Sequence, residues 1–269
     1  MTQLSSPETE TEPARAERGR SQPLVSFFAA LQFLTVLPPL VRRLFTDDEL
    51  GRSVGWFPLV GLFIGGLLAL LNTALMRLFP APLAAAIVLS AWVLLTGALH
   101  LDGFLDSCDG LLGGRTPEDR LRIMRDERVG AFAVSGGVLL LLLKHSALSS
   151  LAQPSCAVVV APVVGRWLIS LAVVRYPYAR EHGLGRSMKD HAGKREAVIS
   201  SVLALLAVII IGDRCGALAV AVAGFAGWCV VRLALARLPG LTGDVYGAVC
   251  EISEAVVLIV FTACPYSAA

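Results

Sequence analysis

The sequence predicts an all-α integral membrane protein, a polytopic helical bundle with about seven transmembrane helices. Hydrophobic residues fill 55% of the 269 positions, charged residues fill 16%, and the mean hydropathy is +0.70. A soluble domain with this balance would lack the polar residues to cover its surface. The net charge of +2 gives no indication of a nucleic-acid partner, because in a membrane protein the placement of charges matters more than their sum.

Residues 1–22 stand apart from the rest of the chain. They mix acidic and basic residues with Ser and Pro and contain no apolar core. This composition excludes a signal peptide and predicts a disordered tail. Residues 23–269 are predicted to form a single transmembrane domain, since the length leaves room for one bundle and its connectors.

Long apolar runs provide the expected transmembrane helices, each of which needs ~20 residues to cross a bilayer. They lie at 54–76, 83–101, 130–150, 157–175, 196–212, 216–236 and 247–265. A further run at 24–41 is of borderline length and ends in a Pro pair. It could span the membrane, lie at the interface or re-enter, and the sequence leaves these alternatives open.

The orientation follows from the basic residues, which gather in two connectors, 102–129 and 176–195. Cytoplasmic loops carry an excess of Lys and Arg, so both connectors are predicted to be cytoplasmic. Seven spans counted from residue 54 place 237–246 on the same side. The polar segments with chemical potential are therefore expected to face the cytoplasm from the cell (inner) membrane.

Three carboxylates at 102–109 form the main candidate site. Asp102, Asp106 and Asp109 are spaced i, i+4 and i+7, which places them on one face of a helix that continues out of the 83–101 span. Carboxylates this close repel one another unless a cation lies among them. We therefore expect them to bind a hard divalent cation, most simply Mg²⁺. The alternative is a solvated helix end without a ligand.

Glycines surround this acidic stripe and favour a ligand over a solvated helix end. Gly103 and Gly110 interrupt the stripe, and Gly113 and Gly114 follow it. A backbone without side chains allows a bulky ligand to approach closely. Gly113 and Gly114 are accordingly predicted to contact substrate.

Arginines flank the stripe and predict an anionic ligand beside the metal. A short helix is expected after Thr116, a candidate N-cap that precedes Pro117. The guanidinium group binds phosphate oxygens bidentately, so Arg115, Arg125 and Arg128 are candidate substrate ligands, and the loop at 175–188 adds Arg180. The general excess of positive charge in cytoplasmic loops is the alternative explanation.

A second acidic set lies in the last apolar run. Asp244, Glu251 and Glu254 recur at i, i+7 and i+10, again on one helical face. Carboxylates inside an apolar segment are usually functional, so Asp244 and Glu251 are candidate catalytic residues. The alternative is structural neutralisation by an embedded cation, with Arg166, Lys144 or Arg232 as the partner.

Several ordered motifs resemble the cobalamin synthase family, the membrane-bound adenosylcobinamide-GDP ribazoletransferases. The resemblance covers residues 25 to 262 and departs from the family pattern at Val36, where the family commonly has Arg. This weakens any phosphate-binding role for the N-terminal segment. The motifs are FLTVLP at 33–38, WFPLVGLFIG at 56–65, LHLDGFLDSCDGLLGG at 99–114, RLRIMRDERVGAF at 120–132, PYAREHGLG at 177–185 and LTGDVYGAVCEISE at 241–254.

The resemblance implies a Mg²⁺-dependent transferase of cobalamin biosynthesis. Such an enzyme joins adenosylcobinamide-GDP to alpha-ribazole or its 5′-phosphate and releases GMP. Asp102, Asp106 and Asp109 would bind the metal, and Asp244 with Glu251 would complete the site or act as base. Other cobamide-assembly enzymes are possible partners. A cleft facing the cytoplasm is expected between 102–129 and 237–255.

Two other functions remain as alternatives. A CDP-alcohol phosphotransferase also places aspartates at a helix end, but its motif carries Ala and Arg where this chain has none after Asp102 and Gly103. An ion-coupled transporter could use Asp109, Glu251 and Glu254 as coupling groups. Against this alternative, the charges gather at one membrane face and no internal repeat is present.

Overall fold

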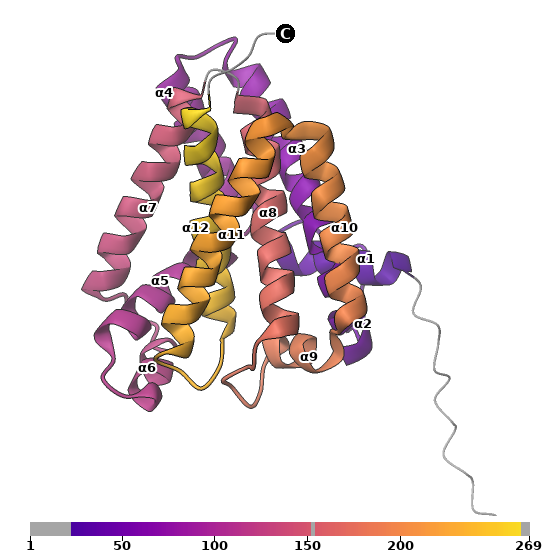
Figure 1. Cartoon of the computed structure of the whole chain (residues 1–269), viewed down its shortest axis with the longest axis vertical. Coiled ribbons are helices and arrows are strands. Elements are labelled where there is room, and N and C mark those ends of the chain that lie inside the picture. The colour runs from indigo at the N-terminus through magenta and orange to yellow at the C-terminus, as the bar shows by residue number, and fades with distance from the viewer. Residues whose placement is uncertain (1–22, 152–153, 265–269) are drawn as a thin grey trace, which may run out of the picture.

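The computed structural model describes residues 23–151 and 154–264, which fold into a bundle of helices (Figure 1). No β-strand forms within these ranges, although Tyr178 and Leu241 make one isolated bridge. The helices are α1 (Pro23–Leu34), α2 (Asp47–Ser53), α3 (Phe57–Leu75), α4 (Ala81–Leu95), α5 (Leu99–Gly113), α6 (Pro117–Ile123), α7 (Ala131–Ser150), α8 (Pro154–Arg175), α9 (Leu184–His191), α10 (Lys194–Ile211), α11 (Asp213–Leu235) and α12 (Gly243–Ala263). The tail expected at 1–22 lies outside the described residues.

The all-α polytopic prediction is confirmed, but the number of spans is lower than expected. Five of the described elements are long and apolar enough to cross a membrane, namely 47–75 and the helices α7, α8, α11 and α12. A sixth span exists if α4 and α5 count as one. The expected span at 196–212 forms α10, whose 18 residues begin with three charged ones, Lys194, Arg195 and Glu196, and so leave a shorter apolar stretch.

The helix after the 83–101 run does not continue in the direction of the span, contrary to the prediction. The chain bends by 88° between α4 and α5. Gly97 and Ala98 adopt left-handed conformations, with φ of 58° and 55°, which end α4 and redirect the chain. A Cβ on Gly97 would lie 2.8 Å from Val36 Cγ1, so the corner needs glycine at this position.

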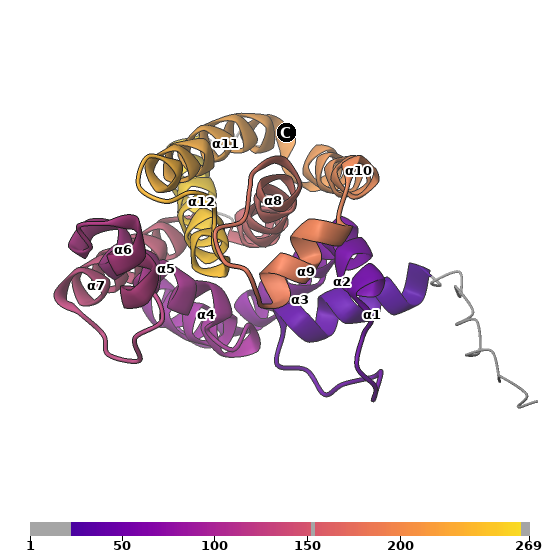
Figure 2. The ribbon, with the colours of Figure 1, turned by 90° about the horizontal axis from the view of Figure 1, so that it is seen from below.

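The open question about the run at 24–41 is answered by α1. This helix has 12 residues and is therefore about 18 Å long, too short to cross a bilayer. In both ribbon views α1 lies across the bundle, whereas the long helices run parallel to the bundle axis (Figures 1 and 2). The following residues pack against the α4–α5 corner, where Val36 N donates a hydrogen bond of 2.9 Å to Leu95 O.

The interior of the bundle is built around α8, which lies between α3, α10 and α12 (Figure 2). Small residues allow these helices to approach closely, as in many membrane proteins. A Cβ on Gly61 of α3 would lie 2.5 Å from Pro162 O of α8, and one on Gly65 would lie 2.7 Å from Val159 Cα. Backbone contact between helices thus fixes their positions.

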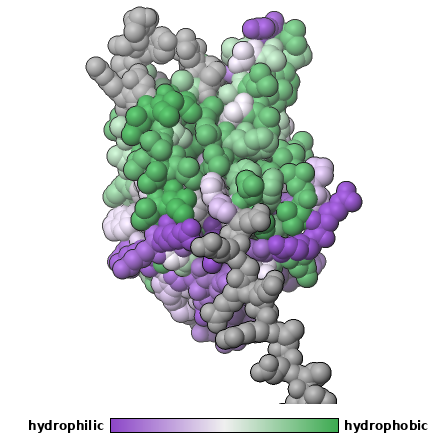
Figure 3. Space-filling view, turned by 90° about the vertical axis from the view of Figure 1, so that its right-hand side faces the viewer, coloured by the Kyte–Doolittle hydropathy of each residue, from purple (hydrophilic) through white to green (hydrophobic). Residues whose placement is uncertain are grey.

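Polar residues are distributed unequally along the bundle. On the face drawn in Figure 3, hydrophobic residues cover the sides and hydrophilic residues gather at the lower end. The connectors 114–130 and 176–183 lie at this end together with α5 and α6 (Figure 1). The second half of α5, which carries Asp106 and Asp109, therefore lies outside the five single-helix spans, at the polar end.

Candidate active site

Three segments distant in sequence meet at the polar end of the bundle. The 176–183 loop is tied to the start of α12 by two hydrogen bonds of 2.8 Å, from Ala179 N to Leu241 O and from Leu241 N to Pro177 O. The same loop reaches the end of α6, because Arg180 donates a hydrogen bond of 3.2 Å to Met124 O. These contacts tie the 176–183 loop to the start of α12 and to the end of α6.

The three aspartates of α5 share one cavity, as the spacing predicted. Asp102, Asp106 and Asp109 line a cavity of about 290 Å³ together with six residues of the segment 124–129. Its lining includes five acidic residues and two arginines, Asp102, Asp106, Asp109, Asp126, Glu127, Arg125 and Arg128. Negative charge therefore exceeds positive charge around this space.

Close packing of α5 against α12 brings a fourth carboxylate to the group. A Cβ on Gly103 would lie 2.9 Å from Asp244 Cα, and one on Gly247 would lie 2.7 Å from His100 O. Only glycine permits this approach of the two backbones. Asp244, in the first turn of α12, consequently lies beside Asp102, and both line a second cavity.

The Asp244 carboxylate is held in place by two hydrogen bonds to its Oδ2 atom. Arg180 donates one of 2.5 Å, and the Thr242 hydroxyl donates one of 3.2 Å. Thr242 is also the N-cap of α12, where its side chain accepts a hydrogen bond from Val245 N. The cap and the ion pair together fix the orientation of Asp244.

The carboxyl group of Asp106 is surrounded by other negative charges, which affect its pKa. Burial and the negative charges of Asp244, Asp102 and Asp109 together raise the pKa of its carboxyl group to about 7, although Arg180 opposes the rise. A carboxylate in this position gains from a bound cation, because a nearby positive charge favours its ionised form.

Asp109 differs from its neighbours because both of its oxygens already bind the protein. Gly130 N donates to Oδ2 at 2.6 Å and Ala133 N donates to Oδ1 at 2.9 Å. These amides belong to the first turn of α7 and its cap residue, where a negative charge is favoured. Asp109 thereby attaches α7 to α5 beside the acidic cavity.

Oxygen ligands for a divalent cation are present, although they do not form a preformed cage. Among the described residues, no three His, Cys, Asp or Glu side chains converge closely enough to hold a metal by themselves. Mg²⁺ usually binds one or two carboxylates and completes its shell with water and substrate phosphates. The acidic cavity, with Asp102 and Asp106 not engaged by backbone amides, fits that mode of binding.

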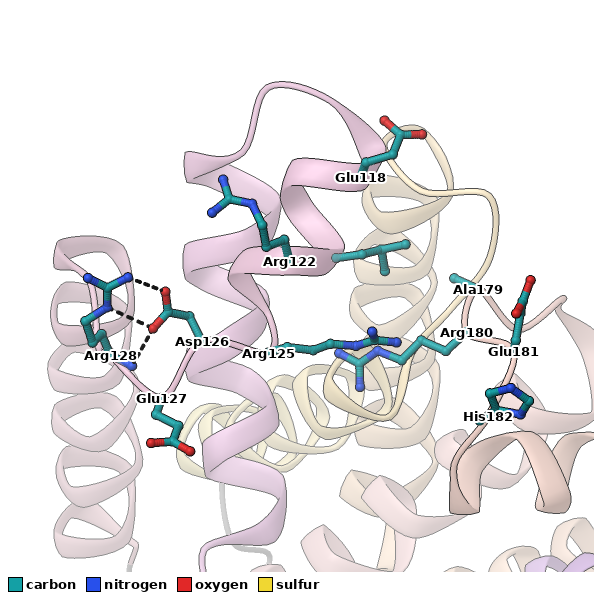
Figure 4. A pocket seen from close by; sticks show the side chains of 11 residues that line it. Glu118, Arg122, Arg125, Asp126, Glu127, Arg128, Ala179, Arg180, Glu181 and His182 are labelled. Atoms are coloured by element: carbon teal, nitrogen blue, oxygen red, sulfur yellow. Dashed lines mark hydrogen bonds and ion pairs between the residues drawn. The ribbon is translucent and has the colours of Figure 1, made fainter.

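An arginine-lined cleft of about 1040 Å³ opens beside the acidic cavity. The two spaces share the segment Arg125–Arg128 as a common wall. Arg125 and Arg180 point toward each other across the cleft (Figure 4). The lining contains equal numbers of positive and negative side chains. They are four arginines and four acidic residues, Arg122, Arg125, Arg128, Arg180, Glu118, Asp126, Glu127 and Glu181.

Arg128 has a carboxylate partner within the chain. Its Nη2 atom lies 2.8 Å from Asp126 Oδ2 (Figure 4), and the hydrogen bonds from Arg128 lower the pKa of Asp126 to about 2. No ion pair of Arg125 occurs among the described salt bridges. Of the two predicted arginines in this segment, Arg125 is thus the more available to an anion.

Three predicted substrate ligands lie away from these cavities. Arg115 is exposed and does not line the three cavities described here, and the same holds for Gly113. Gly114 has a structural reason for its lack of a side chain, since a Cβ would lie 2.5 Å from Arg120 Cγ. The glycines end α5 and admit α6.

Glu251 lies in a buried ion-pair cluster within the bundle, apart from the acidic cavity. Lys144 of α7 contacts Glu251 at 2.5 Å and Glu254 at 2.6 Å. Glu254 also pairs with Arg166 of α8, which lies near His100 Nδ1 at 3.4 Å. The alternative interpretation, neutralisation by embedded cations, therefore holds for Glu251 and Glu254. Asp244 instead lies at the candidate site.

Two arginines of structural importance were not anticipated. Arg120 and Arg237 both donate hydrogen bonds to Leu111 O, near the end of α5. They occupy a carbonyl that has no partner within the helix. The sequence held a weak signal for this role, since basic residues are common where helix ends need donors.

The cleft expected between 102–129 and 237–255 exists in a modified form. The first segment does line it, but the opposite wall is Ala179–His182. The start of α12 instead lines a smaller cavity of about 160 Å³ on the other side of Asp102. The 176–183 loop covers α12, which explains the difference.

Comparison with known proteins identifies close relatives. The chain matches the family described as cobalamin-5-phosphate synthase over residues 26–262. A Roseiflexus sp. strain RS-1 protein named adenosylcobinamide-GDP ribazoletransferase is 37% identical over 259 residues, covering 94% of this chain and 95% of the relative. A Pseudomonas fluorescens strain Pf-5 protein of the same name is 41% identical over 239 residues, covering 88% and 98%. No solved structure matches the chain.

Proposed function

Because this chain belongs to the cobalamin-5-phosphate synthase family, we propose that it is an adenosylcobinamide-GDP ribazoletransferase. It joins adenosylcobinamide-GDP to alpha-ribazole or its 5′-phosphate, and GMP is released. The observation that supports this reaction best is the junction of an acidic cavity with an arginine-lined cleft through one shared wall. Attack of a hydroxyl on a diphosphate increases negative charge on the phosphate oxygens and the leaving group, and metal-binding carboxylates and arginines together can stabilise that charge.

The reaction replaces one phosphorus–oxygen bond by another. A ribose hydroxyl of the nucleoside attacks the phosphorus on the cobinamide side of the diphosphate. The bond from that phosphorus to the bridging oxygen breaks, and GMP leaves with the electron pair. Arg125 and Arg180 face each other across the cleft and would bind the diphosphate oxygens, where negative charge increases in the transition state.

Asp102 and Asp106 are the carboxylates that would hold Mg²⁺. Bound there, the ion would neutralise charge on the phosphate oxygens and on the leaving group. Asp109 contributes through its hydrogen bonds to Gly130 N and Ala133 N, which place α7 against the cavity. The phosphates of the substrate would supply the remaining oxygen ligands.

Asp244 is the group that would receive the proton of the attacking hydroxyl. It lines the cavity on the far side of Asp102, where the nucleoside can approach without crossing the arginine cleft. Its orientation is fixed by Arg180 and Thr242, and a base must be oriented toward the proton that it accepts. Glu251 is not needed for this role, because Lys144 neutralises it.

The polar end of the bundle would face the cytoplasm, with the protein in the inner membrane. Eight of the 13 described Lys and Arg residues outside the long helices lie in the segments 102–129 and 176–193, and such an excess marks the cytoplasmic side. Both charged substrates would then enter the site from the cytoplasm without crossing the membrane.

The test is an assay of the purified protein in liposomes with adenosylcobinamide-GDP, alpha-ribazole 5′-phosphate and Mg²⁺. GMP and the corrinoid product are both measured, with EDTA as the control. We expect the two products in equal amounts and their loss with EDTA. Absence of both products from folded protein would contradict the proposal. Counterflow uptake or transfer from a CDP-alcohol would then identify one of the alternative functions.

A further inference from the structure

The small cavity beside Asp102 and Asp244 is not used by the arginine-bound substrate. It has a volume of about 160 Å³ and lies among α1, α3, α5, α8, α9 and α12. Asp102 lines both this cavity and the acidic one. The two spaces therefore meet at Asp102, and apart from α5 the small cavity is lined by helices that do not line the acidic cavity.

The size of this cavity limits what it can hold. Whole small-molecule sites usually occupy ~300–1,000 Å³, so neither a corrinoid nor a complete nucleotide fits into 160 Å³. Apolar cavities of roughly 150 Å³ bind benzene. A planar aromatic ring system, with the rest of its molecule outside the opening, is the class of ligand that matches.

The chemistry of the walls agrees with a flat apolar ligand. Most lining side chains are aromatic or aliphatic, among them Phe33, Phe57, Ile169, Val173 and Met188. Aromatic and aliphatic side chains line most small-molecule sites, and a few polar groups set the orientation. The inner wall is thus suited to a ring system rather than to a phosphate.

One polar group in the wall lacks a partner within the protein. The hydroxyl of Tyr246 is buried and makes no hydrogen bond with the described residues, and Tyr246 as a whole is 6% exposed. Buried hydroxyl groups are nearly always hydrogen-bonded, because an unpaired one is costly. A ligand with a ring nitrogen would supply the missing partner.

We propose that this cavity binds the aromatic base of the acceptor nucleoside, a fused-ring azole, and presents its ribose hydroxyl to Asp102 and Asp244. This inference rests on the proposed function, because it assigns the second substrate of that reaction. The base enters between α5, α8 and α12, while the diphosphate substrate occupies the arginine cleft. The two substrates thereby meet from opposite sides of the carboxylates.

The test fills the cavity and compares the KM values of the two substrates. In Val173→Phe a larger ring enters the space, whereas Val174→Phe makes the same change at the next position, which does not line the cavity. We expect Val173→Phe to raise the KM for the nucleoside at least about tenfold, with the KM for adenosylcobinamide-GDP within twofold. The control should match the wild type in both values.

A nucleoside with a smaller base provides a readout that general damage to the fold would not give. In Val173→Phe the KM for an imidazole riboside should rise less than the KM for alpha-ribazole, because its single ring needs less space. Tyr246→Phe is the second variant, which keeps the volume and removes the hydroxyl. It should raise the KM for alpha-ribazole about three- to tenfold and should not change the KM for the other substrate.

The outcomes separate this inference from the proposed function. Normal turnover with unchanged or equally changed KM values in both cavity variants would overturn the base site and leave the proposed function standing. Absence of turnover in the wild type would contradict the proposed function, and equilibrium binding of labelled alpha-ribazole then decides the site. Binding to the wild type that Val173→Phe weakens at least tenfold would support it. Equal binding to both would overturn it.

Discussion

Two groups of charged residues in this protein differ in their balance of charge, because one is neutral and the other is negative. The buried cluster between α7, α8 and α12 contains two cations and two carboxylates linked by three ion pairs, namely Lys144, Arg166, Glu251 and Glu254. The acidic group at the polar end contains four carboxylates, Asp102, Asp106, Asp109 and Asp244, of which only Asp244 forms an ion pair, with Arg180, among the described salt bridges.

The comparison shows how to distinguish a structural carboxylate from a functional one in a membrane protein. A charge in an apolar environment is costly unless a partner neutralises it. The buried cluster supplies all of its partners internally and needs no ligand. Asp102 and Asp106 have no such partner among the described salt bridges, which supports the proposal that they bind a cation.

The largest expected effect is on turnover, from Asp106→Asn. Removal of one charge from the acidic group should lower kcat by about a thousandfold or more, because stabilisation of the transition-state charge is lost. The protein should remain folded in the membrane, since less repulsion remains. Asp119→Asn, on the exposed face of α6, is the matched control. Near-normal turnover of Asp106→Asn would remove the distinction between the two groups.

Changes in the buried cluster should lower stability. Lys144→Met leaves the buried carboxylates one cation short and should lower the free energy of unfolding by about 3–5 kcal/mol. The addition of Glu251→Gln restores neutrality and should recover part of this loss. Thermal unfolding in detergent measures both variants. A Lys144→Met protein as stable as the wild type would show that the cluster is not a structural unit.

Arg180 pairs with Asp244 and also lines the arginine cleft. Its substitution should have an intermediate effect on turnover. Arg180→Gln removes the ion pair with Asp244 and a donor in the cleft, so kcat/KM should fall about ten- to a hundredfold. Arg180→Lys should recover only part of this activity, because an ammonium lacks the planar fork. Arg115→Gln is the control and should change kcat/KM less than twofold, given that Arg115 lies outside the cavities.

A smaller effect concerns the pH dependence of stability in metal-free protein. Because the pKa of Asp106 is raised to about 7, the folded state binds more protons than the unfolded state between about pH 4 and 7. Stability should therefore fall as the pH rises through this range. We expect Tm to drop by about 2–4 °C between pH 5.5 and 7.5 in EDTA. In Asp106→Asn this drop should be clearly smaller, and an unchanged drop would assign it to other groups.

The sequence indicated the acidic group from short-range spacing, which a helix converts directly into a shared face. Asp102, Asp106 and Asp109 needed no other information. The partner of Asp109 was not predictable, because Gly130 and Ala133 reach it only after α7 packs against α5. The contact that requires glycine at the 88° corner was likewise not predictable, because Val36 lies 61 residues before Gly97.

Glu251 illustrates the limit of arguments from helical periodicity. Its face on α12 was predicted correctly together with Asp244, and a cation partner was a recognised alternative. The choice between the two depended on Lys144, which is 107 positions away in the sequence. Helix packing brings these residues together, and a single sequence contains no direct signal for such a contact.

The corner between α4 and α5 also determines how the site relates to the electric field across the membrane. Along a continuous span, Asp109 would lie about 10 Å from Asp102 in depth. With α4 along the membrane normal, the bend of 88° instead spreads the carboxylates sideways at nearly one depth. Charges at equal depth experience the same potential, so no work is done when a cation is shared among them. Turnover in liposomes should therefore be equal with and without a membrane potential.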